Sequence, residues 1–560
     1  MIADVSITEK SFGAKSLYKN LRFSIADDEK IGVIGRNGVG KSTLLGILAG
    51  TDTDYTGDVV YRRGVSIVSS RQEHHGHEHK TVLGYILGDL PEYAHLSRII
   101  ETYPMTMGDN DQKITKYTEA LERFSMLGYY HNEELIVEDL KRVQIDEAKA
   151  HGPLRALSGG QKRLVEVVKI MHSHAHLALI DEPTNHMDYL AKKQFIDWMK
   201  SAREAMMIIT HDRDVLRSVD RIIEIKDGEA FIVNGNYDHY LRQNADSTSN
   251  AMHEYEVVQR NIANLRDKVI QFRRLKERAR DPDTIKQFKR REKQAQAELD
   301  ELLTIEKPSF WIDKSSVEQL GLTHGKQYEK YKARNIMIRG TKTIDGHSRM
   351  LVNVSDLRLG YGESPLFGST SFQLREGERV ELRGRNGAGK TTLIRAILQE
   401  ALRIQAPHVI AAVQPKCFAG YIEVDSKTVI GVYEQEVSSK LFELTLYEAI
   451  ESIYLSRGLT INDARVRQLM SDYLFEPSDI GQRVGSLSGG QKARLQLIAM
   501  LANSPNLLIL DEPTNHLDLP SIEELEIALG RYQGAILYVS HDTYFQEAIG
   551  GTIITIAASQ

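Results

Sequence analysis

Apolar runs alternate with glycine turns and helical patterns through most of the chain. The run EKIGVIG (29–35) precedes a glycine turn and a helical pattern, while LALID (177–181) and LLILD (507–511) are continuously apolar and end in a carboxylate. Such runs are typical of strands buried on both faces of a parallel sheet. MMIITHD (206–212) and ILYVSHD (536–542) predict neighbouring strands that end in histidine. The pattern therefore predicts α/β domains.

One set of motifs occurs twice. The matching stretches are 12–25 with 361–374, 35–42 with 384–391, 156–163 with 486–493 and 181–188 with 511–518. The offset is 349 for the first two pairs and 330 for the last two, and Gln72 matches Gln435 at an offset of 363. Copy two is thus 14 residues longer before that glutamine, and copy one is 33 residues longer after it. We expect two homologous domains (1–243 and 346–560) around a different central segment (244–345).

The central segment has a heptad-like pattern. Its apolar positions are Met252, Tyr255, Val258, Ile262, Leu265, Val269 and Phe272, then Ile285, Phe288, Ala295, Leu299 and Leu302. This spacing predicts two helices that pack as an antiparallel hairpin, turning near 281–284. A first helix of about 30 residues would be ~45 Å long.

Composition narrows the class of protein. The chain has 560 residues, of which 41% are hydrophobic and 26% charged, with a net charge of −6. Its single cysteine, Cys417, excludes a disulfide within the monomer and suits a reducing compartment. No apolar run reaches the ~20 residues that span a bilayer, and the first residues lack a secretory signal. We expect a soluble, cytoplasmic protein.

Positive charge is concentrated in the central hairpin. Residues 260–293 hold 13 Lys or Arg and 5 Asp or Glu, so the rest of the chain carries −14. The basic residues nearest the turn are Arg273, Arg274, Lys276, Arg278, Arg280, Lys286, Lys289, Arg290, Arg291 and Lys293. A charge run on a coiled coil is usually a solvated face, but these charges gather at one end without matching acids. That distribution favours contact with nucleic-acid phosphates.

Each copy carries a GxxxxGK[ST] loop between a predicted strand and a helix. Glycines let the backbone N–H groups converge on phosphate oxygens, and the helix N-terminus favours negative charge. Lys41 and Lys390 are expected to reach the β- and γ-phosphates of a nucleotide, and Ser42 and Thr391 to bind Mg²⁺.

Two neighbouring carboxylates follow a buried strand in each copy. Asp181 and Asp511 are expected to hold Mg²⁺, directly or through water. Glu182 and Glu512 come next and are placed to orient or deprotonate the attacking water. The alternative, that these carboxylates only cap helices, is disfavoured because the spacing from the phosphate loop occurs twice.

Together the phosphate loops, Gln72 and Gln435, LSGGQ, DEPTNH and the strand-terminal histidines resemble the ATP-binding cassette ATPases. The resemblance covers both copies and implies two tandem cassettes, joined by the helical hairpin, that enclose two ATP molecules. Each site would join one cassette's phosphate loop to the LSGGQ of the other. Lys41 would then work with Ser488 and Gly490, and Lys390 with Ser158 and Gly160.

The resemblance also implies individual contacts. His211 and His541 would contact the γ-phosphate, Gln72 and Gln435 would lie at the metal, and Phe12 and Tyr361 would stack on adenine. The remaining nucleotide contacts would be Gly35, Asn37, Gly38, Gly40, Thr43, Ser158, Gly159, Gly160 and Gln161, and Gly384, Asn386, Gly387, Gly389, Thr392, Ser488, Gly489, Gly490 and Gln491.

Twin cassettes with a charged helical linker and no membrane spans look like the F subfamily. Its members are mostly translation factors or ribosome-protection proteins that confer antibiotic resistance. The resemblance implies a monomer whose ATP-bound form enters the ribosomal tRNA exit site. Its hairpin would then contact peptidyl-tRNA and large-subunit rRNA, and ATP hydrolysis would allow release. Two alternatives stay open: an ATPase that acts on DNA, although such relatives often end in a basic coiled coil, and the engine of a transporter.

Four features have no settled role in the sequence. The 33-residue excess of copy one is either an arm that contacts the large subunit or an enlarged helical subdomain, and 307–345 has no assigned partner. HHGHEHK (74–80) lacks regular zinc spacing and is expected in a surface turn, so metal binding is disfavoured. His172, His174 and His176 precede a buried strand and are expected to pack or cap.

Overall fold

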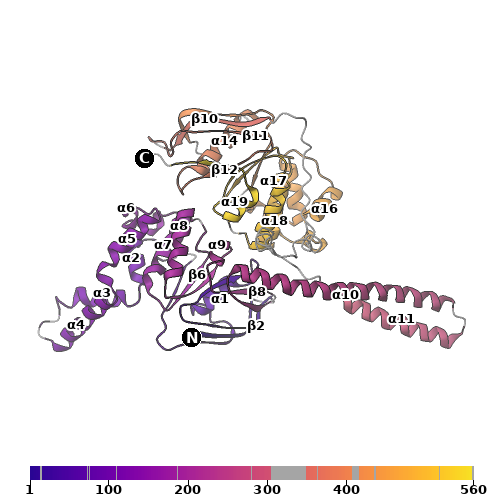
Figure 1. Ribbon diagram of the computed structural model, residues 1–560, viewed down its shortest axis with the longest axis horizontal. Coiled ribbons are helices and arrows are strands. Elements are labelled where there is room, and N and C mark those ends of the chain that lie inside the picture. Colours follow the sequence, from indigo (N-terminus) through magenta and orange to yellow (C-terminus); the bar gives the residue numbers. More distant parts are fainter. Residues whose placement is uncertain are drawn as a thin grey trace. The chain divides into compact units, whose positions relative to one another are not determined.

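The computed structural model (Figure 1) describes residues 1–303 and 349–557, except 13–14, 72–73, 75, 107, 109, 186, 227, 279–280, 362, 406–414, 434–436, 474, 488 and 516. Gln72, Arg280, Gln435, Ser488 and the stretch 307–345 therefore lie outside the described residues. The chain divides into two compact units, Met1–Tyr237 with Asn335–Gln560, and Asp238–Arg334. The first holds both cassettes and the second the hairpin.

Two sheets form the core of cassette 1. The first contains β1 (Ala3–Phe12), β2 (Lys15–Ile25) and β4 (Thr56–Tyr61), antiparallel in the order β2-β1-β4. The second contains β3 (Lys30–Ile34), β5 (Ile67–Ser69), β6 (Leu177–Asp181), β7 (Ala205–Ile209), β8 (Arg221–Lys226) and β9 (Glu229–Asn234), in the order β5-β6-β7-β3-β8-β9. All neighbours in it are parallel except β8 and β9.

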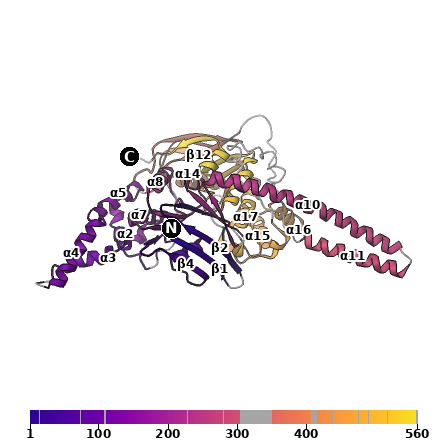
Figure 2. The ribbon, with the colours of Figure 1, turned by 60° about the horizontal axis from the view of Figure 1, so that its bottom comes forward.

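Helices surround this core. They are α1 (Lys41–Leu48), α2 (Val82–Asp89), α3 (Tyr93–Thr102), α4 (Asp111–Met126), η1 (Tyr129–His131), α5 (Asn132–Arg142), α6 (Glu147–Ala150), η2 (Leu154–Ala156), α7 (Gly159–Ser173), α8 (Tyr189–Ser201) and α9 (Arg213–Leu216). Figures 1 and 2 show α3 and α4 side by side, leading away from the strands of the cassette. This pair has no counterpart in copy two, so the 33-residue excess of copy one builds it.

Cassette 2 repeats the plan. Its strands are β10 (Met350–Gly360), β11 (Thr370–Arg375), β12 (Arg379–Arg383), β13 (Lys416–Val424), β14 (Ile430–Tyr433), β15 (Leu507–Asp511), β16 (Ala535–Val539) and β17 (Thr552–Thr555). They form an antiparallel sheet β11-β10-β13 and a parallel sheet β14-β15-β16-β12-β17.

The helices of cassette 2 are α14 (Lys390–Gln405), η3 (Ser439–Leu441), α15 (Leu446–Ser456), α16 (Asp463–Asp472), η4 (Pro477–Gly481), η5 (Val484–Ser486), α17 (Gly489–Leu501), α18 (Leu519–Gly530) and α19 (Thr543–Ile549). Helix α14 has 16 residues where α1 has 8, which accounts for part of the extra length before Gln435.

The buried strands that the apolar runs predict are confirmed. Every residue of β3, β6 and β7 is buried, as are the four apolar residues of β15. In a parallel sheet covered on both faces such strands have no polar side, which is why they read as continuous apolar runs. Within each cassette these strands run in parallel with their neighbours, so their carboxyl ends meet at one edge of the sheet, where the repeated motifs begin.

The predicted hairpin is confirmed in type and longer than expected. Helix α10 (Tyr237–Arg278) has 42 residues and α11 (Pro282–Leu303) has 22, and they lie side by side in Figures 1 and 2. The residues in the seam between them are Ile262, Leu265, Val269, Ala295 and Leu299, with Phe272 packed against them. These are predicted heptad positions.

The carboxylate of Asp281 accepts the backbone N–H of Thr284 at 2.9 Å, and Pro282 opens α11, so the chain turns close to the predicted position. One expectation about the hairpin needs correction. Among the described residues, the basic charges do have one matching acid. Glu292 forms ion pairs with Arg273, at 3.2 Å, and with Lys276. In the described part of the hairpin, Arg274, Lys286, Lys289, Arg290, Arg291 and Lys293 have no ion pair, and all six are exposed.

None of the described helices is long and apolar enough to cross a bilayer.

Packing between α10 and α11 generates a test. Leu265 is 8% exposed in the seam, whereas Ile270 on the opposite side of α10 is 48% exposed. Leu265→Ala should destabilise the hairpin by about 2 kcal/mol, the low end for a buried leucine, because this seam is narrow. Amide hydrogen exchange should accelerate in α10 and α11 and stay unchanged in the cassettes. Equal acceleration by Ile270→Ala would contradict the seam.

Candidate active sites

The first phosphate loop joins β3 to α1 at the carboxyl edge of the parallel sheet. Gly40 caps α1 with a φ of +103°, a left-handed conformation. A Cβ at Gly40 would lie 2.6 Å from the hydroxyl oxygen of Tyr18, which donates a hydrogen bond to the Gly40 carbonyl. In cassette 2 a Cβ at Gly389 would lie 2.6 Å from the ring of Phe367. An aromatic ring beneath each loop therefore makes glycine necessary there.

The two phosphate-loop lysines have the same environment. The Lys41 ammonium donates to the carbonyls of Gly35 and Arg36 at 2.8 and 3.1 Å. Lys390 donates to Gly384 and Arg385 at the same distances. Burial lowers the pKa of both lysines. Each cation is thus held at its own loop, partly desolvated, where phosphate oxygens could replace the carbonyls.

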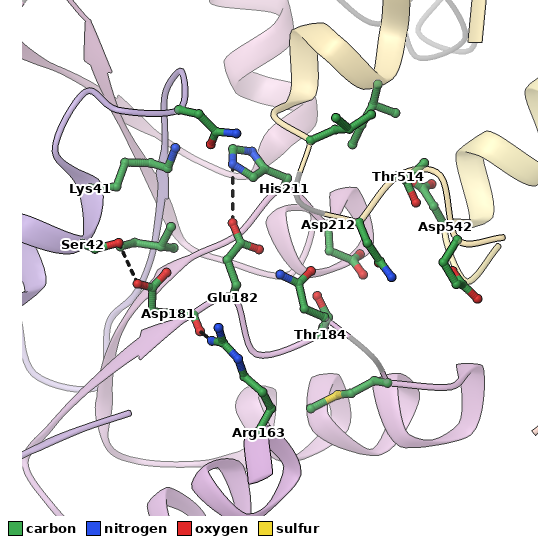
Figure 3. Close-up of a pocket in the computed structure, with 18 of the residues that line it drawn as sticks. Lys41, Ser42, Arg163, Asp181, Glu182, Thr184, His211, Asp212, Thr514 and Asp542 are labelled. Carbon is green, nitrogen blue, oxygen red and sulfur yellow. Dashed lines mark hydrogen bonds and ion pairs between the residues drawn. The ribbon is translucent and has the colours of Figure 1, made fainter. Parts of the chain in front are cut away.

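Oxygen ligands suited to a divalent cation meet beside Lys41. The hydroxyl of Ser42 donates to Asp181 at 2.7 Å, and Arg163 holds the Asp181 backbone carbonyl at 3.1 Å (Figure 3). In cassette 2 a hydrogen bond from Thr391 opposes the burial that raises the pKa of Asp511. A hydroxyl and a carboxylate at this position are the donor set that Mg²⁺ takes in nucleotide sites.

The next residue in each cassette has an unusual backbone. Glu182 and Glu512 have φ values of +48° and +49°, which side-chain-bearing residues seldom adopt. Their N–H groups bond to Ile209 and Val539 at 2.8 and 2.9 Å, so the neighbouring strand holds the strained conformation. Burial and then the charge of Asp181 raise the pKa of Glu182 to about 8, and burial raises the pKa of Glu512 to about 7. Both carboxyls are therefore poised near neutrality, where a proton acceptor is most useful.

A histidine faces each of these glutamates. His211 Nε2 lies 3.4 Å from Glu182, and His541 Nε2 lies 3.2 Å from Glu512 (Figure 3 shows the first pair). Burial lowers the pKa of His211 to about 3, so this ring is neutral. Within the described residues neither ring nitrogen of His211 makes a hydrogen bond. A buried imidazole without a partner fits a site built for a further ligand.

Residues of both cassettes line each of two cavities. The first, of about 590 Å³, joins Lys41, Glu182 and His211 to Thr514 and Asn515 of cassette 2. The second, of about 950 Å³, joins the loop 384–387 to Ser158, Gly160 and Gln161 of cassette 1. The second cavity therefore brings the phosphate loop of cassette 2 and the LSGGQ of cassette 1 together.

At the first cavity the corresponding contact is tight. A Cβ at Gly489 would lie 2.7 Å from the side-chain nitrogen of Asn37, so the LSGGQ of cassette 2 approaches the loop of Lys41 closely. Ser488, the predicted partner of Lys41, lies outside the described residues. The side chain of Phe12, predicted to stack on adenine, lies outside what the structure describes, and Tyr361 is not among the described residues that line either cavity. Their role stays a prediction.

One pair of functional residues is missing from the sequence-based set. Asp188 caps α8, and its second oxygen faces the backbone N–H of Asn386 at 3.4 Å. Asp518 caps α18 and accepts the N–H of Asn37 at 3.1 Å. Although burial opposes ionisation, these N–H groups help to hold the pKa of both aspartates below the usual value. The signal was available, because in both cassettes an aspartate two residues after DEPTNH opens a helix.

A buried ion pair also joins the cassettes. The guanidinium of Arg213, which is fully buried, lies 3.1 Å from Glu526 of cassette 2. Such a pair is expensive to separate, because each charge would lose its partner before it regains water.

The histidines discounted as metal ligands have other partners. His74 is buried and hydrogen-bonds Glu166 at 2.8 Å, so the expected surface turn is wrong at this residue. His172 pairs with Asp139 at 2.9 Å and His174 caps α7, as the packing or capping reading predicted. The described residues include no group of three or more His, Cys, Asp or Glu side chains that could hold a metal ion.

Family models agree with this architecture. A model described as ABC transporter matches residues 18–185 and 367–515, and a second model with the same description matches 223–318. These matches cover more than half of the chain. The chain therefore belongs to the ATP-binding cassette family, and it is an ATP hydrolase.

Relatives define the branch of the family. The ATP-binding protein YdiF of Bacillus subtilis is 30% identical over 567 residues, which cover 100% of this chain and 80% of YdiF. The energy-dependent translational throttle protein EttA of Escherichia coli is 29% identical over 555 residues, 96% of this chain and 89% of EttA. Together such relatives place the chain in the F subfamily.

A solved structure shares the fold. It is that of the archaeal ribosome recycling factor aABCE1 in complex with the stalk protein aP1, at a TM-score of 0.54 and 16% identity. The match covers 98% of this chain and 87% of that one. The tandem-cassette arrangement is therefore common to both.

The aspartate that faces the opposite loop can be tested in cassette 1. Asp188→Ala should lower stability by about 1 kcal/mol through the lost cap. In a Lys41→Ala protein, where only the Lys390 site can turn over ATP, it should also lower turnover about tenfold. The reason is that the Lys390 loop loses the carboxylate that faces the N–H of Asn386. Asp188→Asn keeps a capping oxygen and should restore the melting temperature but only part of the turnover. Unchanged turnover in Asp188→Ala would show that the residue is a helix cap and no more.

Proposed function

We propose that this ATPase binds the translating ribosome in its ATP-bound, closed form and leaves after hydrolysis. The observation that carries the proposal is the reciprocal arrangement of the cassettes. Each phosphate loop faces groups of the other cassette, Asp518 at one loop and Asp188 with Ser158 at the other. ATP can favour closure only by binding the closed state more tightly, and a site divided between two cassettes does so.

Groups of the phosphate loop and the carboxylates at the end of the buried strand carry out hydrolysis in each site. Lys41 and Lys390 would bind the phosphates, and Ser42 with Asp181, or Thr391 with Asp511, would hold Mg²⁺, whose charge would offset that of the phosphate oxygens. Glu182 and Glu512, with pKa values near neutrality, orient the attacking water and accept its proton.

The histidines complete each site. His211, held neutral by burial, and His541 would donate to the γ-phosphate of a bound nucleotide. Because phosphate release removes the ligand that spans both cassettes, hydrolysis ends the preference for the closed state.

The hairpin supplies the RNA contact. Six exposed basic residues, which form no ion pair with the part of the hairpin that the structure describes, lie in α10 and α11 near their turn: Arg274, Lys286, Lys289, Arg290, Arg291 and Lys293. Arginine binds phosphate through paired N–H groups and stacks on exposed bases. The chain is otherwise acidic, so the charge is confined to this surface. EttA, a relative across nearly the whole chain, is by name a translational throttle. This name favours ribosomal RNA as the RNA that the hairpin binds. On this proposal the hairpin lies against peptidyl-tRNA and large-subunit rRNA.

Blocking hydrolysis tests the closed state. Glu182→Gln with Glu512→Gln keeps the shape of both sites but removes the proton acceptor, so the protein should stay bound to ribosomes and halt growth. Sedimentation with ribosomes should depend on ATP and disappear when Lys41→Ala and Lys390→Ala are added. In the presence of ATP, the glutamine variant should sediment with ribosomes to a greater extent than the unmodified protein. If the two proteins sediment with ribosomes equally, the ribosome is not the partner.

Charge reversal tests the hairpin. Replacing Arg274, Lys289, Arg290 and Arg291 with Glu should weaken ribosome binding and flatten its dependence on salt, because each lost phosphate contact lowers the salt slope by about 0.7–0.9. Basal ATP turnover should change less than about twofold. A matched control reverses four exposed basic residues of the cassettes: Lys200, Lys427, Lys440 and Arg531. Equal affinities of the two reversed proteins would contradict an RNA-binding role.

A further inference from the structure

A buried lysine of cassette 1 contacts the histidine segment of cassette 2. Lys192, in α8, is 4% exposed, and its ammonium donates to the backbone carbonyl of His541 at 3.2 Å. It also donates to Asp214 at 2.7 Å and lies 3.2 Å from Asp212. Although burial opposes its charge, the two aspartates raise the pKa of Lys192 above the usual value. The lysine is therefore a cation whose three N–H donors face three protein oxygens.

One of these aspartates also binds a second group of cassette 2. Thr543, two residues after His541, donates its hydroxyl to Asp214 at 3.0 Å. Asp212 caps α9 and accepts the backbone N–H of Asp214 at 2.9 Å, so the segment that carries both aspartates is itself held. The chain from His541 to Thr543 is thus bound to cassette 1 at two points.

The other contacts of His541 lie in the Lys390 site. Its backbone N–H donates to Glu512 at 3.2 Å, and its Nε2 lies 3.2 Å from Glu512 and 3.2 Å from the side-chain oxygen of Asn386. Cassette 2 therefore holds the N–H and the ring of His541, and Lys192 of cassette 1 holds its carbonyl. Displacement of that carbonyl would change the backbone torsion of His541 and move its ring relative to Glu512.

Helix α8 brings two groups to the Lys390 site. Asp188, its cap, faces the N–H of Asn386 at 3.4 Å, and Lys192 follows four residues later. Residues four apart lie on the same face of a helix. Any movement of α8 that brings Asp188 to the phosphate loop therefore also brings Lys192 to His541.

Cassette 2 has an isoleucine at the matching position. The offset of 330 that aligns the two DEPTNH motifs matches Asp188 with Asp518, but it matches Lys192 with Ile522. Ile522 is 2% exposed and belongs to the apolar core of its cassette. An aliphatic side chain has no hydrogen-bond donor, so residue 522 cannot hold the carbonyl of His211 as Lys192 holds that of His541. The two sites have the same aspartates and differ at this residue.

We propose that Lys192 is a positioning residue for hydrolysis in the Lys390 site, where it holds His541 of the opposite cassette in place for the γ-phosphate. The inference rests on the composite sites of the proposed function. Hydrolysis in the Lys390 site then requires an ammonium from cassette 1, whereas residue 522 supplies none to the Lys41 site. The two sites are therefore unequal in their dependence on closure, although their catalytic residues match.

The test measures turnover at one site at a time in the full chain. Glu182→Gln leaves the Lys390 site to hydrolyse ATP, Glu512→Gln leaves the Lys41 site, and both parents keep the two lysines that bind ATP. Lys192→Met in the first parent should lower kcat about tenfold, because the ring of His541 is no longer held for the transition state. KM should change less than about twofold, because protein oxygens occupy this ammonium. In the second parent kcat should also change less than about twofold.

Three further variants serve as controls. Lys193→Met makes the same change at the neighbouring exposed lysine of α8 and should leave both parents unaltered. Should Lys192→Met fold poorly, adding Asp214→Asn removes the buried pair together, which costs less stability than leaving one charge alone. The double variant should show the same loss of kcat. Thr543→Val removes one hydroxyl contact and should lower kcat of the Lys390 site about threefold. A role confined to stability would lower the melting temperature without distinguishing the two sites.

Asp188→Ala in the Glu182→Gln parent separates this inference from the composite sites beneath it. If neither Asp188→Ala nor Lys192→Met lowers kcat, the composite site itself is contradicted. If Asp188→Ala lowers kcat and Lys192→Met does not, the composite site stands and the role of Lys192 is wrong.

Other results would also overturn the role of Lys192. They are equal losses in the two parents, a change in KM without a change in kcat, and a parent with no turnover, which would show that the sites do not act separately. A loss in the Lys41 site alone would assign the lysine to the first cavity, which it lines together with Asp212 and Asp542 (Figure 3 labels the two aspartates).

Discussion

The structure depends on a contact between each phosphate loop and an aspartate of the opposite cassette. Asp518 accepts the N–H of Asn37, and Asp188 faces the N–H of Asn386. Because each aspartate also caps a helix of its own cassette, the position of one phosphate loop is linked to the fold of the other cassette. A nucleotide at either loop therefore influences both halves of the chain. Because each phosphate loop needs a group from a second cassette, the motifs occur in two copies within one unit.

In each site the reactivity of the glutamate depends on a strained backbone and on burial of its carboxyl group. Glu182 and Glu512 keep left-handed backbones because strands β7 and β16 hold their N–H groups, and their carboxyls keep raised pKa values because they are removed from water. Strain and burial of a carboxyl group destabilise the fold, and the packing of the apolar sheets, whose central strands are wholly buried, offsets this destabilisation. Cassette 1 adds a further buried charge at Glu166, which matches Gln496 in cassette 2.

Sequence patterns predict much of this. The runs LALID and LLILD coincide with β6 and β15, and the heptad positions Leu265 and Val269 lie in the hairpin seam. Local patterns fail where a long-range partner decides the outcome. The pairing of Glu292 with two basic residues needs the register of two helices, and the burial of His74 needs Glu166, 92 residues away. Asp188 reads as a cap from the sequence, because its second contact comes from a loop 198 residues away.

The central claim is that closure around ATP brings the basic hairpin against ribosomal RNA. The most direct measurement places a photoreactive residue at position 290, which is exposed on α11, in the Glu182→Gln, Glu512→Gln protein and maps its cross-links to ribosomes. The account predicts cross-links to RNA of the large subunit or to tRNA with ATP, and none when both phosphate-loop lysines are replaced. Ribosome binding with ATP but no cross-link from the hairpin to RNA would contradict it.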